Sequence, residues 1–574
     1  MSRTLCVVFA GVFVVGMSAC GGGAAPPSDA SRPAAAPARV DPAVAAIGVQ
    51  SARFAPTDLS ADVSALPESE RRALAHMVRA AQVMDALFLR QVWAGNEAML
   101  TALVTDDTPL GRARLGYFLV NKGPWSRLDH NEPFVSGAPP KPAAANFYPA
   151  DATKEDVERW LATQAGPARQ AATGFFTTIR RGANGQLMAV PYSVEYQSEL
   201  AVAASHLRAA AGATTQPTLK AFLEARAAAF ASNDYYDSDV KWMELDATIE
   251  PTIGPYEVYE DEWFNYKAAF EAFITIKDQA ESAKLQQFAG ALQEIENHLP
   301  IDAKYRNPAL GALAPIAVVN TVFSSGDANR GVQTAAFNLP NDERVIAAKG
   351  SKRVMLKNNQ QAKFDQVLLP IAQIALAPAD RGNVAFDAFF THILMHELVH
   401  GLGPHTITVA GRATTVRQEL KDTYSAIEEA KADAAGLFAL QFLIDNGQLP
   451  KSMQDTMYTT FLASAFRSIR FGITEAHGRG QAVQLNFLLD QGAFTVNADG
   501  TFAVVTGKIR EAVTALTRDL LMIEAEGNYA GAKAILETLG VVRPSTQAVF
   551  DRLTTVPVDI APRFTAAAAL LAAY

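Results

Sequence analysis

Apolar residues recur every three or four positions over long stretches of this 574-residue chain. That spacing places them on one face of an α-helix. The pattern predicts helices at 68–92, 154–164, 219–231, 266–298, 386–401, 426–446 and 508–527, and a short Ala-rich terminal helix at 565–574. Several of these stretches end in Gly or Asn-Gly, which is a usual helix stop.

Short apolar or β-branched runs at 311–323, 353–356, 406–409 and 494–505 predict a few strands or extended loops. The expected fold class is therefore mainly α with some β. A composition of 49% hydrophobic and 19% charged residues is typical of a folded chain, and the length allows more than one lobe.

The amino terminus predicts an exported protein. Arg3 precedes an apolar run at 5–15 and small residues that end before Cys20. This order resembles a bacterial lipoprotein signal at 1–19, with Cys20 lipidated; plain secretion is the alternative. The Gly/Ala/Pro-rich segment 20–46 is interpreted as a flexible tether. We expect anchoring at the periplasmic face of a membrane, the outer membrane being favoured.

The same interpretation decides the cysteine chemistry. Cys6 and Cys20 are the two cysteines of the chain, so a mature chain with acylated Cys20 has no thiol for disulfides or Cys-ligated metals. The formal net charge is −9 and no Lys/Arg-rich block occurs, which argues against nucleic acid as a partner.

Histidines carry the strongest chemical signal. Within FFTHILMHELVHGLGPH, His396 and His400 are four residues apart, so a helix projects both imidazoles from one face toward a shared metal ion. Glu397, beside the first of them, is placed to deprotonate a metal-bound water. At this composition chance would produce the pattern about 0.014 times. The alternative is a pair of core histidines in a hydrogen-bond network.

A catalytic zinc site uses three protein ligands and an open position. His405 is one position too early for the His-x-x-Gly-x-x-His continuation, and we interpret it as a loop residue or as a residue that supports the ligands. Glu429, on the following helix, is the candidate third ligand, and Asp433 lies one turn further along the same face. Asp433 is expected to accept a hydrogen bond from a ligand histidine. A solvated helix-start carboxylate is the alternative for Glu429.

Ser425 and Glu428 have the spacing of a capping box, which predicts that the helix carrying Glu429 begins there. Glu428 then has two interpretations. It is either a cap without chemistry or a supporting residue of the metal site.

At this point the chain resembles the dipeptidyl peptidase III family of zinc exopeptidases, in ordered blocks from about 250 to 539. EEAKADAAGL resembles the family segment that carries the third ligand, which implies Glu429 as ligand and Asp433 as its neighbour. EAHGRGQAVQLNFLLDQG resembles the stretch with a transition-state histidine, which implies His477.

Further blocks imply substrate-binding residues. AFNLPNDERV resembles the strand that binds the peptide backbone and free amino end, which implies Asn338 and Asn341, and KRVMLKNN adds Asn358. IGPYEVYEDEWFNYKAAFEAFI resembles the segment with the active-site tyrosine. Tyr256 is the first choice there and Tyr259 the second.

The five-residue HExxH motif is similar to that of the plant and bacterial branch of the family. The plant relatives carry a Nudix domain, but no Gly-x5-Glu-x7-Arg-Glu pattern occurs in this chain, so we do not expect nucleotide hydrolysis. The resemblance implies two largely helical lobes around a wide cleft, with zinc on one of them. We expect a first lobe at 47–280 and a catalytic lobe at 281–574, with about 330–380 and the C-terminus returning to the first.

The expected activity is release of dipeptides from the amino end of short peptides with one Zn²⁺ per chain, held by His396, His400 and Glu429. Glu397 would act as base, while His477 and Tyr256 would donate hydrogen bonds to the oxyanion. The alternatives are an endopeptidase or other zinc hydrolase, and a non-catalytic lipoprotein that binds zinc or peptides.

Overall fold

The computed structural model describes residues 41–311 and 315–574. The predicted signal segment 1–19, Cys20 and most of the predicted tether lie outside the described residues. The end of that tether is helical, because α1 (Pro42–Ser51) begins with Pro at the first helical position and continues in Ala and Val. No helix in the described part of the chain combines the length and apolarity that crossing a bilayer requires.

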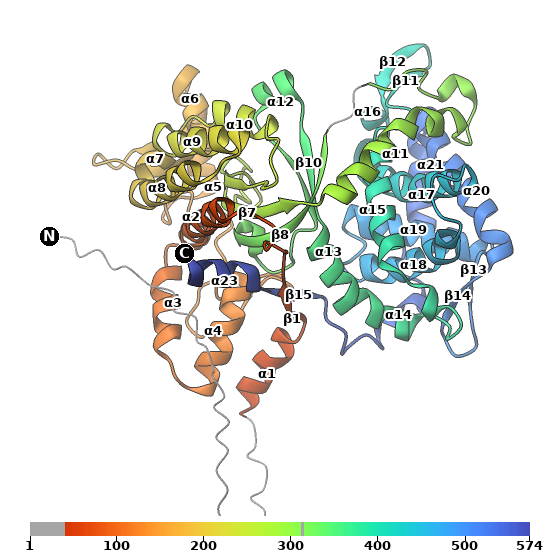
Figure 1. Cartoon of the computed structure of the whole chain (residues 1–574), viewed down its shortest axis with the longest axis horizontal. Helices are drawn as coiled ribbons and strands as arrows, with labels where there is room; N and C mark the ends of the chain where they lie inside the picture. The colour runs from red at the N-terminus through yellow and green to blue at the C-terminus, as the bar shows by residue number, and fades with distance from the viewer. Residues whose placement is uncertain (1–40, 312–314) are drawn as a thin grey trace, which may run out of the picture. The chain divides into compact units, whose positions relative to one another are not determined.

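The first lobe packs helices on one side of a sheet (Figure 1). Its long helix α2 (Glu68–Val92) buries apolar residues at intervals of three and four, as the sequence predicts, and it packs against α8 and against two strands of the sheet. The other helices of this region are α3 (Asn96–Thr105), α4 (Pro109–Asn121), α5 (Lys154–Ala162), α6 (Gly166–Thr173), α7 (Tyr192–Glu195), α8 (Gln197–Ala213), α9 (Pro217–Ser232) and α10 (Tyr236–Met243).

Five strands form the largest sheet, in the order β6-β7-β8-β10-β9. They are β6 (Thr252–Pro255), β7 (Phe270–Lys277), β8 (Ile316–Gly326), β10 (Lys352–Leu356) and β9 (Ala336–Leu339). Strands β8 and β10 run parallel, and the other pairs are antiparallel. β9 is therefore an edge strand, with one side open to a further strand.

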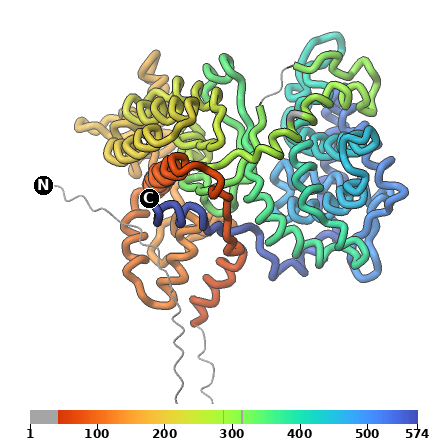
Figure 2. Tube along the Cα trace, viewed as in Figure 1, coloured from red at the N-terminus to blue at the C-terminus, as the bar shows by residue number. Residues whose placement is uncertain are grey.

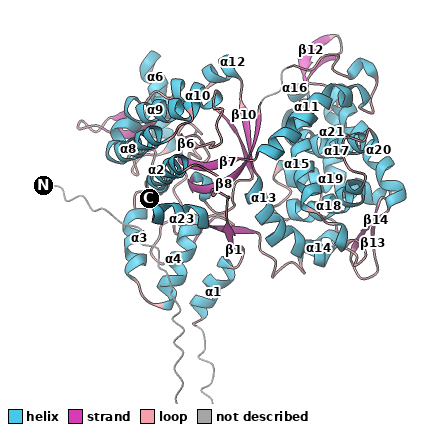
Figure 3. Ribbon diagram, viewed as in Figure 1, coloured by secondary structure: helices cyan, strands magenta, loops and turns pink. Residues whose placement is uncertain are grey.

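The sheet lies between helices of the two lobes (Figure 3). Alternate residues of a strand point to opposite faces. In β10, Val354 and Leu356 join the core of the first lobe, whereas Met355 joins the core of the second. By the same alternation Arg353 lies on the side of Met355, toward the second lobe.

The second lobe is a packed set of helices around its own core. The central pair is α15 (Phe386–Val399) and α17 (Tyr424–Asp445), which lie against each other. Around them lie α11 (Gln279–His298), α13 (Lys357–Lys363), α14 (Leu369–Ala375), α16 (Val416–Leu420), α18 (Ser452–Ile469), α19 (Ala476–Asp490), α20 (Thr506–Ala525), α21 (Tyr529–Thr538) and α22 (Pro544–Phe550).

Short elements complete the fold. They are β1 (Phe54–Leu59), β2 (Trp125–Ser126), β3 (Glu132–Pro133), β4 (Thr177–Arg181), β5 (Leu187–Pro191), α12 (Glu343–Lys349), β11 (Thr406–Val409), β12 (Arg412–Thr415), β13 (Phe494–Val496), β14 (Phe502–Val504), β15 (Asp559–Phe564) and α23 (Thr565–Ala573). β1 and β15 pair in parallel, so the C-terminal end of the chain lies beside the N-terminal segment of the first lobe (Figure 2).

Most helices predicted from periodicity are confirmed, but the prediction of one helix at 266–298 is wrong. Its first part is the strand β7, and the helix α11 begins at Gln279. Seven of the eight residues of β7 are buried, so the apolar run FEAFITIK carries no amphipathic alternation. A continuous apolar run does not distinguish a central strand from a buried helix.

Candidate metal centre and active site

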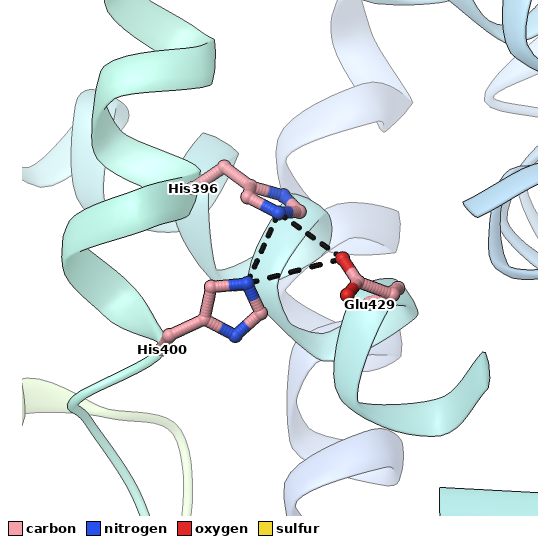
Figure 4. Close-up of side chains that lie close together, drawn as sticks. All are labelled: His396, His400 and Glu429. Atoms are coloured by element: carbon pink, nitrogen blue, oxygen red, sulfur yellow. Dashed lines mark hydrogen bonds and ion pairs between the residues drawn. The ribbon is translucent and has the colours of Figure 1, made fainter. Parts of the chain in front are cut away.

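Three side chains from two helices converge at one point of the second lobe (Figure 4). One ligand atom each from His396, His400 and Glu429 lies within 4.8 Å of the others. The Nε2 atoms of the two imidazoles are 3.2 Å apart, and the Glu429 Oε2 atom is 3.2 Å from Nε2 of His396 and 3.8 Å from that of His400. His400 follows the last residue of α15 but keeps helical dihedrals, so both imidazoles share one face.

The outer nitrogens of both imidazoles are bound to carboxylates. His396 Nδ1 lies 2.7 Å from Asp433, and His400 Nδ1 lies 2.7 Å from Glu428. An imidazole that donates from Nδ1 presents a lone pair at Nε2. Two lone pairs and a carboxylate oxygen therefore face one another, and Glu429 Oε2 is buried without a hydrogen-bond partner in the described part of the chain. This donor set fits a cation.

Asp433 holds His396 through neutral neighbours. One carboxylate oxygen binds the imidazole, and the other accepts amide hydrogens from Gln481 and Gln484 of α19. The Asp433 backbone carbonyl lies 3.0 Å from Nε2 of His392. Although burial opposes its charge, the histidine and amide neighbours hold the pKa of Asp433 below its usual range. The same carboxylate overcomes the effect of burial on His396 and raises its pKa to about 10, so without a metal ion the imidazole also holds a proton at Nε2, which a bound cation would replace.

Glu428 holds His400 through charged neighbours. Its Oε1 atom accepts a hydrogen bond from Lys431 at 2.8 Å as well as from the imidazole. Lys431 Nζ also donates to the carbonyl of Leu402, just beyond the end of α15. The carboxyl of Glu524, on α20, is fully buried and neither of its oxygens has a hydrogen-bond partner among the described residues. Burial raises the pKa of Glu524 well above its ordinary value, although the Lys431 charge opposes this.

The predicted capping box is wrong. α17 begins at Tyr424, after Thr423, and no side chain caps it. Ser425 therefore lies inside the helix, and Glu429 is in its second turn. Glu428 is more than a cap without chemistry, because its carboxylate binds His400.

Two glycines allow the helices of the site to approach closely. A Cβ atom on Gly436 of α17 would lie 3.4 Å from the backbone nitrogen of His396. A Cβ atom on Gly480 of α19 would lie 3.1 Å from the backbone nitrogen of Ala430 in α17. Contacts this short leave little room for a side chain. These crossings place the carboxylates of α17 beside the imidazoles.

Glu397 lies beside the ligands at the end of α15, and its side chain is 20% exposed. Its Oε2 atom lies 3.0 Å from Nε of Arg353, on strand β10. His477, at the start of α19, is 69% exposed, and its Nε2 atom lies 3.2 Å from Glu429 Oε2. Its ring stacks toward that of His396 with the centroids 6.2 Å apart. Both side chains are therefore close to the three candidate ligands.

Of the two candidate tyrosines, Tyr259 is the one that faces a cavity. Tyr256 is only 6% exposed and packs in the core of the first lobe, beneath the guanidinium of Arg226. Burial raises the pKa of Tyr256 beyond its usual range. Tyr259 is 66% exposed and lines a cavity together with Asn338 and Asn341. The preference for Tyr256 is therefore corrected in favour of Tyr259.

The cavity beside β9 has a volume of about 570 Å³. Exposed Asn338 lies on β9 itself, and Asn341 donates to the carbonyl of Tyr256 at 3.0 Å. Sequence reasoning missed the acidic residues of this cavity, Glu257, Glu271 and Asp327, which are spread over three segments of the chain. Glu257 and Glu271 both belong to the block that resembles the tyrosine segment, but nothing local marks either of them as a binding residue.

These carboxyls crowd one another. Burial and the neighbouring Asp327 raise the pKa of Glu257 to about 7, and burial and Glu257 raise the pKa of Glu271. Arg330 forms an ion pair with Asp327, and Arg127 forms one with a neighbouring glutamate. Glu271 Oε1 is buried without a hydrogen-bond partner in the described residues. A cationic group in this cavity would lower these pKa values and favour the ionised carboxylates.

Asn358 does not face this cavity. Its side chain oxygen accepts from the backbone nitrogen of Thr321 at 2.8 Å, and its amide donates to the carbonyls of Thr321 and Ser60. All of its polar atoms thus hold strand β8, and the expected substrate contact is corrected to a structural one. His405 is exposed in the loop between α15 and β11 and lies outside the convergent group.

Comparisons with known proteins point to one family. A family model described as peptidase family M49 matches residues 177–409. A solved structure of dipeptidyl-peptidase III from Corallococcus sp. strain EGB is 62% identical, covers 92% of this chain and 98% of its own, and superposes with a TM-score of 0.76. The chain belongs to the dipeptidyl peptidase III family.

A second dipeptidyl peptidase III structure, from Caldithrix abyssi, is 48% identical with a TM-score of 0.87 and covers 91% of this chain and 99% of its own. A curated relative from Arabidopsis thaliana, named Nudix hydrolase 3, is 42% identical over 90% of this chain and 74% of its own length. That name describes the plant protein. The family resemblance, the mainly helical two-lobed fold and the peptidase class are confirmed for this chain.

Proposed function

We propose that this metallopeptidase uses Zn²⁺ to release dipeptides from the amino end of short peptides. One observation carries the proposal: two Nε2 lone pairs and an unpartnered carboxylate oxygen converge from His396, His400 and Glu429. Two imidazoles and one carboxylate are a usual ligand set of catalytic zinc. Other divalent ions bind such a set too, so the identity of the metal belongs to the proposal.

When bound, the cation supplies Lewis acidity that activates water and polarises a carbonyl. Glu397 would accept the proton of the attacking water and deliver it to the leaving amine. His477 and Tyr259 are the proposed donors to the oxyanion, with Tyr259 taking the role first expected of Tyr256. The carboxylates of Asp433 and Glu428 would keep both ligand imidazoles in the metal-binding tautomer.

The cavity beside β9 supports cleavage counted from the amino end. Glu257, Glu271 and Asp327 offer negative charge to a free ammonium group. β9 is an edge strand, so an extended peptide can pair with it while exposed Asn338 contacts the peptide backbone. We propose that the amino end of the substrate lies in this cavity.

We further propose that the chain is exported and held at a membrane by a lipid on Cys20. The residues that support this are the apolar run 5–15 and the small residues before the cysteine. Labelling with a radioactive fatty acid should mark the wild type and spare Cys20→Ala.

The central experiment compares dipeptidyl-naphthylamides and short peptides as substrates, with products weighed by mass spectrometry. We expect dipeptides from free peptides, little cleavage of the same peptides after amino-terminal acetylation, and loss of activity with a chelator. Glu397→Gln should retain zinc and lose about 100-fold or more in kcat. Glu511→Gln, an exposed change on α20, is the matched control.

The outcomes separate the alternatives. Internal fragments from acetylated peptides would make the protein an endopeptidase. Unchanged activity in Glu397→Gln would reject that residue as the base. Zinc binding without turnover of any peptide would leave a binding protein instead of a hydrolase.

A further inference from the structure

A guanidinium from the sheet reaches the proposed base. Nε of Arg353 lies 3.0 Å from Oε2 of Glu397, and Nη1 of the same side chain donates to the Glu397 backbone carbonyl at 2.8 Å. The two side chains are 26% and 20% exposed, so this contact is partly shielded from water. It joins strand β10 to the end of helix α15.

The end of α15 explains why the carbonyl is available. The last carbonyls of a helix have no partner within it. Here His396 O accepts the nitrogen of His400, and the carbonyls of Leu398 and Val399 accept nitrogens of the following turn. The Glu397 carbonyl receives the guanidinium of Arg353 instead. A cation is also favoured at this end by the helix dipole.

The guanidinium binds the carboxylate and the backbone of one residue at the same time. This pair of contacts fixes the carboxylate relative to its own helix, which limits the rotamers of a long and otherwise mobile side chain. Oε2 of Glu397 contacts Arg353, so the other carboxylate oxygen is the one that could accept a proton from water. A lysine at the same position has one point charge and no planar fork, so it cannot reproduce both contacts equally well.

The position of Arg353 connects this contact to the substrate strand. In the antiparallel register of β10 and β9, Arg353 lies opposite Asn338. Cross-strand partners share a face of the sheet. The residue proposed to contact the peptide and the residue that holds the base are therefore adjacent on the face that is turned toward the second lobe.

We propose that Arg353 is a positioning residue for Glu397. Its guanidinium holds the carboxylate of the base in the orientation needed for catalysis and fixes that carboxylate relative to β9, the strand proposed to bind the peptide. This inference rests on the proposed function. The competing explanation is a helix cap that supports only the stability of α15.

The experiment compares Arg353→Gln and Arg353→Lys with the wild type. Arg344→Gln is the control, because Arg344 is an exposed arginine paired with Asp342. For Arg353→Gln we expect kcat to fall about 10-fold to 100-fold, with KM and zinc affinity within about 3-fold of the wild type. Arg353→Lys should recover part of kcat, because its charge can still meet the carboxylate.

Measurements that do not depend on turnover decide between the two explanations. Thermal unfolding and zinc titration of each variant test the cap, since a cap predicts parallel losses of stability, metal affinity and activity. A crystal structure of Arg353→Gln should show the Glu397 carboxylate displaced or in more than one rotamer. An unchanged Glu397 carboxylate position with unchanged kcat would overturn the proposal. A rise in kcat would also overturn it, because it would mean that the contact with Arg353 slows catalysis.

Failure of the proposed function has a different signature. If the wild type binds zinc but releases no dipeptides, the assigned activity is wrong. The position of the Glu397 carboxylate in Arg353→Gln then still decides whether Arg353 holds it.

Discussion

The two ligand imidazoles are held by carboxylates of one helix, but the surroundings of those carboxylates differ. Behind His396, the second carboxylate oxygen of Asp433 accepts hydrogen bonds from the neutral amides of Gln481 and Gln484. Behind His400, the carboxylate of Glu428 is bound by buried Lys431.

This difference predicts how strongly metal binding responds when Asp433 or Glu428 is replaced. If the carboxylate of Asp433 is lost, the neutral amides of Gln481 and Gln484 supply no charge in its place. On the His400 side, the buried carboxyl of Glu524 lies near Lys431, and the charge of Glu428 helps to keep the pKa of Glu524 raised, so Glu524 can ionise beside Lys431 if Glu428 loses its charge. We therefore expect the His396 side of the site to be the more sensitive one.

The largest effect is expected from Asp433→Asn. The asparagine side chain has one acceptor and one donor. Its NH₂ group would therefore face either the NH₂ groups of Gln481 and Gln484 or the N–H of the imidazole, and two donors cannot form a hydrogen bond. Zinc affinity should fall about 100-fold, as measured by competition with a chelating dye. Asp445→Asn at the end of the same helix is the control. A loss below about 3-fold would show that Asp433 does not hold the ligand.

A smaller effect is expected from Glu428→Gln. The glutamine oxygen can still accept from His400, and removing the charge of Glu428 lowers the pKa of Glu524, so that its carboxyl can ionise near Lys431. Zinc affinity should fall about 10-fold in the same titration. A loss as large as that of Asp433→Asn would contradict the comparison, because it would mean that Glu524 does not compensate.

The smallest effect at neutral pH is expected from Glu524→Gln, and its sign depends on pH. Burial raises the pKa of Glu524 in the folded chain above its unfolded value of about 4.3, so the folded state binds the proton more tightly. The stability from this group is complete below the unfolded pKa and is lost as pH rises toward the folded pKa. Glutamine stays neutral and avoids that loss.

The melting temperature of Glu524→Gln should therefore rise relative to the wild type as the pH increases above the unfolded pKa, in metal-free protein. Glu511→Gln provides the exposed comparison on the same helix. A difference that does not change with pH would show that Glu524 is ionised throughout and belongs to the charged group as an anion.

Much of the site was predictable because its signals are local. The HExxH spacing requires only that 386–400 be helical, and the predicted helix agrees with α15. Glu429 and Asp433 lie one turn apart on α17, so one orientation of that helix brings both to the imidazoles. The capping box failed because α17 already includes Tyr424, so Ser425 lies inside the helix and a local hydrogen-bond motif did not decide where the helix begins.

The substrate side was harder to predict. Tyr256 and Tyr259 are three residues apart in an irregular segment, where no period indicates which side is buried. Asn358 looked like a polar residue after a strand, but the neighbouring backbone of β8 binds all of its polar atoms. The acidic cavity draws on three separate segments, and only their packing brings Glu257, Glu271 and Asp327 together.

The sequence by itself determined the kind of chemistry: two imidazoles and a neighbouring carboxylate on one helix, and two carboxylates one turn apart on another. Helical spacing is a local property of the backbone, so it can be predicted from a short segment. Only the tertiary structure decided that Tyr259 faces the cavity, that Glu524 is buried beside Lys431 and that Arg353 reaches Glu397. Those contacts join segments far apart in the chain, and burial in a packed interior selects them.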